Sequence, residues 1–193
     1  MNYKDAFKSY QPINEQELMD QKLIIDFIDR NPDALDRTNL CAHVTSSAFV
    51  VNQDMTKILF AYHKIYDSWA WVGGHADGNP DLLEVAIKEA IEETGVSKVD
   101  AFSKDIFTLD VIQVTNHIKH GKYVPDHLHL NASFLLIADE NDELSINHAE
   151  NTGVNWFDID DVFNHVSEKR MLSVYQKAFD KIKNIKLSHN QSL

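Results

Sequence analysis

The fold of this chain is decided by the stretch Trp69–Val96, WAWVGGHADGNPDLLEVAIKEAIEETGV. Its pattern predicts the end of a strand, a glycine loop, a helix and a helix stop. Asn79 is a favoured N-cap residue, and Pro80 suits the first helical position, where its missing N–H costs nothing. Gly95 stands where a residue in the left-handed conformation commonly ends a helix. The stretch therefore predicts one well-bounded helix behind a glycine-containing loop.

The side chains of this helix are expected to form two faces. At about 100° per residue, one face carries the apolar set that should meet the core: Leu83, Ile87, Ala90, Ile91 and Thr94. The opposite face carries Glu89, Glu92 and Glu93. Glu89 and Glu93 are a like-charge i,i+4 pair, which costs roughly 0.2–0.5 kcal/mol, and the helix dipole adds to the penalty near the C-terminal end. A hard divalent cation such as Mg²⁺ or Mn²⁺, which prefers carboxylate oxygens, would resolve this conflict.

The stretch resembles the signature of the Nudix hydrolases: a glycine, five residues, a glutamate, seven residues, then Arg-Glu-apolar-any-Glu-Glu-any-Gly-apolar. Gly74 fills the first position, and residues 88–96 (KEAIEETGV) fill the last nine. Trp69 matches a tryptophan often seen ahead of the family's glycine pair. Two positions depart from the signature, because Pro80 replaces the first glutamate and Lys88 replaces the arginine. Lysine keeps the charge but cannot form the planar two-pronged bridge to a carboxylate.

The resemblance implies an α+β domain with the Nudix fold, a mixed β-sheet sandwiched between α-helices, over residues 40–187. An N-terminal helical extension at residues 1–39 would precede it. The implied chemistry is hydrolysis of a diphosphate linkage in a nucleoside diphosphate derivative or similar small phosphorylated metabolite. Glu89, Glu92 and Glu93 would hold the Mg²⁺ or Mn²⁺ that neutralises phosphate oxygens and activates water.

Further site residues are expected around these acids. Glu89 is the candidate to orient or deprotonate water. Glu150 is its rival, because a glutamate shortly before a Trp-Phe strand often belongs to the active site in Nudix proteins. Glycine backbone lacks a Cβ and can approach metal or phosphate closely. The expected substrate-binding residues are Trp69, Gly73, Gly74 and His75.

Several histidines are candidates to lie near the site. In strands or loops around the glycine pair these are His43, His63 and His75. His127 and His129 lie two apart and therefore on one face of a strand. With His117 and His120 nearby, a zinc site is one alternative. A surface or pocket-lining role is favoured, because neither a cysteine pair nor a His-Glu-x-x-His helix accompanies them.

Composition limits the partners of the chain. Its 193 residues include 18 basic and 30 acidic side chains, a formal net charge of −12, which argues against a nucleic-acid polymer as partner. The lone Cys41 excludes an internal disulfide, fits a reducing cytosol and is expected to be a buried small hydrophobe. The start lacks the apolar core of a signal peptide, and the longest aliphatic run, Phe134–Ala138, is too short to span a membrane. These features predict a cytoplasmic protein without a membrane partner.

The remaining elements follow from hydrophobic periodicity. Strands are expected at residues 42–52, 57–64, 105–116, 127–138 and 154–157, with the first two forming a hairpin, and helices at residues 13–31 and 167–185. The first helix should bury Leu18, Ile24, Ile25 and Ile28. It would either cover a flank of its own domain or pair with another subunit, which leaves a homodimer open.

Two other functions remain open. Isopentenyl-diphosphate isomerases share the Nudix fold and a Trp-to-His stretch similar to that from Trp69 to His75, but the cysteine of their stretch is missing here. A non-catalytic Nudix-like binding domain is the second alternative, because Pro80 and Lys88 depart from the signature.

Overall fold

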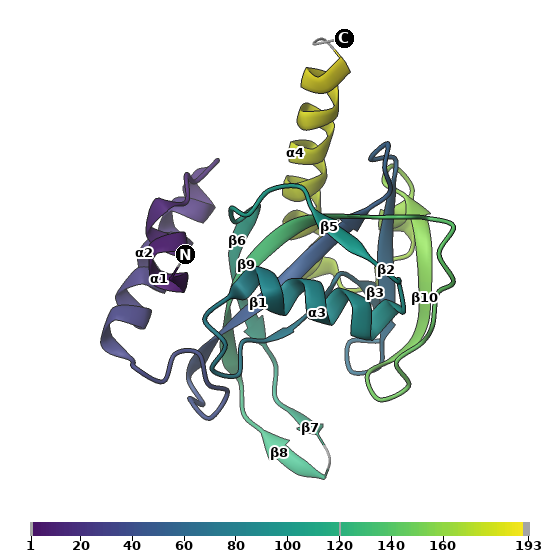
Figure 1. Ribbon diagram of the computed structural model, residues 1–193. Helices are drawn as coiled ribbons and strands as arrows, with labels where there is room; N and C mark the ends of the chain where they lie inside the picture. Colours follow the sequence, from purple (N-terminus) through teal and green to yellow (C-terminus); the bar gives the residue numbers. More distant parts are fainter. Residues whose placement is uncertain (1, 120, 191–193) are drawn as a thin grey trace. The chain divides into compact units, whose positions relative to one another are not determined.

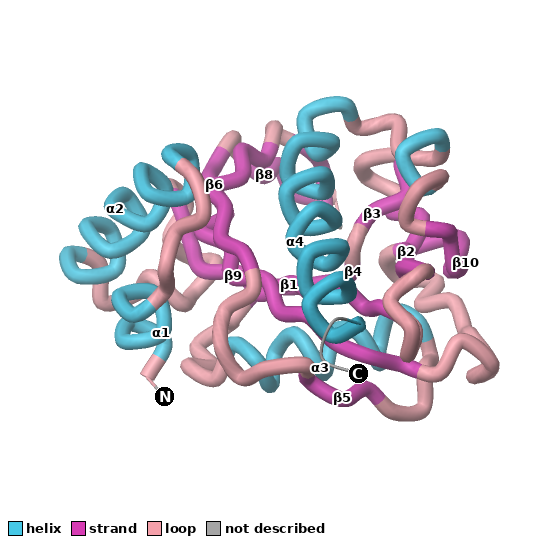
Figure 2. Tube along the Cα trace, turned by 90° about the horizontal axis from the view of Figure 1, so that it is seen from above, coloured by secondary structure: helices cyan, strands magenta, loops and turns pink. Residues whose placement is uncertain are grey.

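The computed structural model of the protein describes residues 2–119 and 121–190 (Figures 1 and 2). The chain divides into two compact units, each built from three segments. Unit 1 comprises Met1–Ser47, Gly73–Ala86 and Ser103–Phe134, and unit 2 comprises Ala48–Val72, Ile87–Phe102 and Leu135–Leu193. Four elements contribute residues to both units: β1 (Ala42–Val51), β4 (Val72–His75), α3 (Leu82–Thr94) and β9 (His127–Ala138). Helices and antiparallel strand pairs occur in both units, so the predicted α+β class is confirmed.

Unit 1 begins with two helices that lie beside a strand of the same unit (Figures 1 and 2). Its further elements are α1 (Tyr3–Ser9), α2 (Glu15–Arg30), β6 (Thr108–Val114), β7 (His117–Lys119) and β8 (Lys122–Val124). Asn14 caps α2, its side-chain oxygen accepting a hydrogen bond from the Glu17 N–H at 2.9 Å. The Val111 N–H on β6 donates to the Asp20 carboxylate on α2 at 2.9 Å. The N-terminal helix therefore covers a flank of its own chain.

The buried face of α2 differs from the predicted apolar stripe. Ile24 and Ile28 are fully buried as expected, but Leu18 is 41% exposed and Glu17 is fully buried. The Glu17 carboxylate can be buried because the Tyr10 hydroxyl donates to its Oε2 at 2.8 Å and the Ile13 N–H does so at 2.9 Å. The hydrogen-bonded Glu17 therefore lies on the buried face together with Ile24 and Ile28, whereas Leu18 does not.

The strands of unit 1 bring three segments of the chain side by side. β6 pairs antiparallel with β9, from Val114 opposite His127 to Thr108 opposite Ser133. The Val44 carbonyl on β1 accepts from the Ala76 N–H just after β4 at 3.2 Å, and the carbonyl of Cys41, the residue before β1, accepts from the Leu128 N–H on β9 at 3.0 Å. β1 therefore has β4 on one side and β9 on the other. Cys41 itself is exposed, so the prediction of a buried cysteine was wrong.

Unit 2 is built around the predicted hairpin. Its further elements are β2 (Lys57–His63), β3 (Ser68–Ala70), β5 (Val99–Ala101), β10 (Asn151–Asp158), two short 3-10 turns η1 (Val162–Asn164) and η2 (Lys169–Met171), and α4 (Leu172–Asn190). β1 and β2 pair antiparallel, β2 also pairs with β3 and β10, and β5 pairs with β9. The buried rings of Tyr175 and Phe179 on α4 pack against Phe49 and Phe60, with 5.1 Å between the ring centres of Phe60 and Tyr175. Within the described residues, no helix has both the length and the apolar character needed to cross a membrane.

The central helix α3 begins two residues later than its sequence suggests. Its N-cap is Asp81, whose Oδ1 accepts from the Glu84 N–H at 3.0 Å, while Asn79 accepts from the Asp81 N–H at 2.9 Å and holds the preceding turn. The predicted helix stop is confirmed. Gly95 has a φ of +76° and donates its N–H to the Ile91 carbonyl at 2.9 Å.

The buried face of α3 is rotated relative to the predicted one. The buried residues are Leu82, Val85, Ala86, Ala90, Glu93 and Thr94, whereas Ile91 is 38% exposed. The sequence placed the three glutamates on the face opposite the core, and this was wrong for Glu93, which is only 3% exposed. Hydrophobicity alone assigns every acidic side chain to the surface. It therefore cannot predict that the Glu93 carboxylate is buried.

Candidate active site

Three carboxylates converge in unit 2. Glu89, Glu93 and Glu150 each offer an oxygen, and these oxygens all lie within 4.8 Å of one another. Glu89 and Glu93 are one turn apart on α3, so helix geometry alone places them on the same side. Glu150 comes from the residue immediately before β10, far away in sequence. The structure therefore places Glu150, a predicted site residue, beside the two helix acids.

Local hydrogen bonds hold Glu150 beside the end of α3. The Glu150 N–H donates to the Asn147 carbonyl at 3.0 Å, and its carbonyl accepts from the Lys64 N–H at 3.2 Å. The next residue, Asn151, is fully buried and its amide donates to the backbone carbonyl of Glu93 at 3.2 Å. The chain segment that carries Glu150 is thereby tied to the last turn of the helix.

Gly95 allows this segment to approach the helix end closely. The Ser145 N–H donates to the Thr94 carbonyl at 2.8 Å. A Cβ atom on Gly95 would lie 2.1 Å from the Ser145 hydroxyl oxygen, well inside contact distance. Glycine is therefore required at this position both for its positive φ and for the space that it leaves.

The charge density of this cluster fits a divalent cation. Two unit charges 4.8 Å apart repel by about 3.5 kcal/mol at an effective dielectric constant of about 20. The burial of Glu93 places one of these charges away from water, which strengthens its attraction to a bound cation. Mg²⁺ and Mn²⁺ take carboxylate oxygens as ligands. The donor set formed by Glu89, Glu93 and Glu150 therefore suits the ion that the sequence implies.

Glu92, the remaining predicted metal ligand, does not join this group. Its side chain is 52% exposed, and its carboxylate lies 3.7 Å from the Lys88 ammonium in an i,i+4 pair. Exposed pairs of this kind contribute about 0–1 kcal/mol and do not hold a side chain firmly in place. The structure thus separates two adjacent glutamates, one buried within the cluster and one at the surface.

The predicted substrate-binding residues have identifiable packing contacts. In unit 2, Trp69 packs its ring against Tyr62 and Phe157, with ring centres 5.4 and 4.9 Å away. In unit 1, Gly73 lies so close to β1 that a Cβ would be 2.6 Å from the Ser46 carbonyl oxygen. Gly74 follows in β4. These packing contacts are a structural reason for a tryptophan at position 69 and a glycine at position 73, and they involve no substrate.

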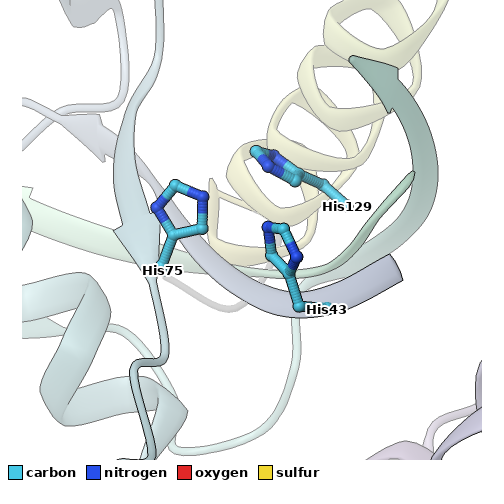
Figure 3. Close-up of side chains that lie close together, drawn as sticks. All are labelled: His43, His75 and His129. Atoms are coloured by element: carbon cyan, nitrogen blue, oxygen red, sulfur yellow. The ribbon is translucent and has the colours of Figure 1, made fainter. Parts of the chain in front are cut away.

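His75 belongs to a second cluster, in unit 1. Figure 3 shows His43, His75 and His129 with their rings gathered around one point, each from a different strand. The centres of the three rings are 4.9 to 5.0 Å apart, and one nitrogen from each lies within 4.8 Å of the others. All three residues are candidates from the sequence, but the sequence does not predict that they group together, because their proximity depends on how β1, β4 and β9 pair.

The other candidate histidines lie elsewhere. His63 stacks on Tyr66 in unit 2, with ring centres 4.5 Å apart. His117 is in β7, where its Nδ1 lies 3.0 Å from the Thr115 carbonyl oxygen. His120 is outside the described residues.

Burial keeps the clustered histidines neutral. Desolvation, with a smaller contribution from the Arg37 charge, lowers the pKa of His75 from 6.5 to about 3. Desolvation, with a contribution from the neighbouring histidines, lowers the pKa of His129 to about 2, and burial also lowers the pKa of His43. His43 is 3% exposed, and its Nε2 has no hydrogen-bond partner among the described residues. An unsatisfied buried polar atom costs about 1–3 kcal/mol.

The comparison with protein families assigns the chain. The model of the NUDIX domain matches residues 42–178, which is well over half of the 193 residues. The chain therefore belongs to the Nudix family, as its signature stretch predicted. No curated protein matches the sequence.

Solved structures show the same fold. A NUDIX-family hydrolase from Clostridium perfringens is 22% identical, with a TM-score of 0.50 over 72% of this chain and 96% of its own. An Ap4A hydrolase from C. elegans is 15% identical, with a TM-score of 0.54 over 75% and 98%. The dihydroneopterin triphosphate pyrophosphohydrolase of E. coli is 14% identical, with a TM-score of 0.52 over 75% and 95%. These likenesses establish the Nudix fold.

Proposed function

We propose that this protein is a metal-dependent hydrolase that cleaves a diphosphate linkage in a nucleoside diphosphate derivative or a similar small phosphorylated metabolite. The observation that carries this proposal is the convergence of Glu89, Glu93 and Glu150 within the region matched to the Nudix family. An Ap4A hydrolase and a triphosphate pyrophosphohydrolase are among the proteins of similar fold, which supports a small phosphorylated substrate. The net charge of −12 supports the same conclusion, because an acidic chain needs a cation to accept an anionic substrate.

The three clustered acids would hold Mg²⁺ or Mn²⁺, the ion type generally used in this family. When bound, such an ion neutralises phosphate oxygens and lowers the pKa of the attacking water. Glu93, buried at the last turn of α3, has little freedom to move and is assigned to binding. Glu89 and Glu150 are only partly buried and can reach solvent, so one of them orients the water and accepts its proton. Glu92, which the family signature predicts as a ligand, is proposed not to hold the ion, because its side chain is exposed and lies outside the cluster.

The remaining parts of the proposal concern the surroundings of the reaction. Trp69, Gly73, Gly74 and His75 are proposed to contact substrate, as the family signature suggests. A cytoplasmic location is proposed from the single cysteine and the composition. A homodimer would have to use a surface other than the face of α2 that packs on β6.

A substrate screen tests the proposal directly. Diphosphate compounds are incubated with the protein and Mg²⁺ or Mn²⁺, and phosphate is measured after phosphatase treatment. We expect metal-dependent release from at least one compound and its loss in Glu93→Gln. Ligand binding without turnover would favour the non-catalytic binding domain. Conversion of isopentenyl diphosphate to an isomer without phosphate release would favour the isomerase alternative.

A further inference from the structure

We infer that unit 1 contains a zinc site, in which His43, His75 and His129 bind one Zn²⁺ through a ring nitrogen each. This site shares no residue with the carboxylate cluster. It is formed by β1, β4 and β9 and does not depend on the proposed hydrolase activity.

The positions of the rings suit a single small ion. Three ring centres at mutual distances of 4.9, 5.0 and 5.0 Å form a nearly equilateral triangle, with the rings directed toward its middle (Figure 3). In a tetrahedral zinc site, Zn–N distances of about 2.0–2.1 Å place the ligand nitrogens about 3.4 Å apart. The nitrogens lie within 4.8 Å of one another. Small rotations of the rings would close the remaining distance without movement of the strands.

Hydrogen bonds orient the ligand nitrogens of two of these rings. The His43 Nδ1 lies 3.1 Å from the Asn39 carbonyl oxygen, which can only accept, so Nδ1 carries the proton. The Nε2 of His43 is then left with a lone pair. It is also the buried atom that has no partner within the described residues. A ligand histidine that donates its other N–H to a backbone carbonyl is the usual arrangement in metal sites.

A fourth histidine orients His129 in the same way. The His127 Nδ1 lies 2.8 Å from the Pro125 carbonyl oxygen and therefore carries the proton. The Nε2 of His127 then accepts from the Nε2–H of His129, 3.2 Å away. This leaves Nδ1 of His129 with its lone pair. His127 thus acts as a positioning residue, and the tautomers of His43 and His129 are both set for metal binding.

The chemistry of the ligands selects zinc over magnesium. The group consists of imidazoles alone, and imidazole suits Zn²⁺ whereas Mg²⁺ prefers carboxylate and water oxygens. The nearby Asp77 carboxylate is engaged with the Arg37 guanidinium, whose Nε donates to it at 2.7 Å.

Three protein ligands leave one position of a tetrahedral zinc open. Structural zinc sites are normally closed by four protein ligands, whereas three histidines and an open position are typical of zinc that binds water or an anion. The site in unit 1 is therefore expected to bind a water molecule or an anionic ligand at its fourth position.

Metal titration of the whole protein tests this inference. Protein stripped with a chelator is titrated with zinc sulfate, with Mg²⁺ present throughout, and binding is followed by calorimetry and by metal analysis after gel filtration. We expect one Zn²⁺ per chain that Mg²⁺ does not displace. His75→Gln and His129→Gln should each weaken zinc binding by at least about 100-fold, because each removes a ligand. His127→Gln should weaken it by about 10–100-fold, as expected for a residue that orients a ligand.

Matched controls separate this site from ordinary surface histidines and from the carboxylate cluster. His117 in β7 and the exposed His148 lie outside the group of His43, His75 and His129. The variants His117→Gln and His148→Gln should therefore bind zinc as the unchanged protein does. Glu93→Gln should also retain zinc. Co²⁺ substitution in the unchanged protein should give the intense visible absorption of a four-coordinate site. Failure of the unchanged protein to retain zinc, or zinc binding that survives both His75→Gln and His129→Gln, would overturn the inference.

Discussion

Exchange of the buried glutamate of α3 for glutamine, compared with the same exchange at its exposed neighbour, tests the assignment of the carboxylate cluster. Glu93→Gln keeps the shape of the side chain and removes its charge. Each carboxylate pair in the cluster, with oxygens within 4.8 Å, repels by about 3.5 kcal/mol at an effective dielectric constant of about 20. Removal of the Glu93 charge relieves this repulsion when no metal is bound. Turnover should fall by about 100-fold or more, or about 2.7 kcal/mol of barrier.

Glu92→Gln is the matched control, because it removes the same charge one residue away. Its carboxylate is 52% exposed and loses only a 3.7 Å ion pair with Lys88, which contributes about 0–1 kcal/mol. We expect its turnover to fall by less than about tenfold. Both variants change the net charge of the chain equally. A difference in their turnover therefore reports where the carboxylate lies and not the loss of charge itself.

Thermal stability with and without metal allows the same comparison before the substrate is known. Mg²⁺ or Mn²⁺ at a hundredfold excess over Kd should stabilise the unchanged protein by about 2.7 kcal/mol. Glu92→Gln should keep most of this gain and Glu93→Gln should lose it. Equal loss in both variants, or a full gain in Glu93→Gln, would refute the argument that burial within the cluster identifies the ligand.

Three further predictions follow from other parts of the structure. Pro80→Glu should change turnover by less than about threefold, roughly 0.65 kcal/mol, because Asp81 already caps α3; a tenfold rise in steady-state rate would show that the missing glutamate matters. Gly73→Ala should destabilise the protein by about 1–3 kcal/mol in urea unfolding, since its Cβ would meet β1 at 2.6 Å; an unchanged midpoint would contradict this contact. Zinc-free protein should lose stability in acid. The pKa values of about 3 for His75 and about 2 for His129 lie below the unfolded value of 6.5, so their contribution is complete above about pH 6.5 and declines by up to about 1.4 kcal/mol per unit for each as the pH falls. Urea midpoints that do not fall between pH 7 and pH 5 would contradict it.

Local physics explains what could be read from the sequence. Gly95 ends α3 because glycine adopts a φ of +76° without steric cost. The hairpin of β1 and β2 follows from two apolar runs separated by a polar turn. Glu89 and Glu93 share one side of α3 because four residues complete about one helical turn. None of these features requires knowledge of distant parts of the chain.

Tertiary structure alone decided which sides of these elements are buried. Ile91 is exposed and Glu93 is buried, the reverse of the hydrophobic expectation. The polar segment before β10 packs against the last turn of α3 through the amide of Asn151. The free energy of that packing depends on contacts between segments nearly sixty residues apart, and periodicity within a helix carries no information about them.

The two clusters show the same division between local and non-local causes. The spacing of the acids within α3 was enough to predict that they form a site. Glu150 could be predicted only from the resemblance to the Nudix family. The grouping of His43, His75 and His129 came only from the pairing of three strands. Strand register depends on non-local hydrogen bonds and on which face is buried, and a shift of one residue would turn each histidine to the opposite face. The sequence by itself thus determined the elements and the helix acids, whereas the histidine cluster exists only because the folded sheet aligns three distant segments.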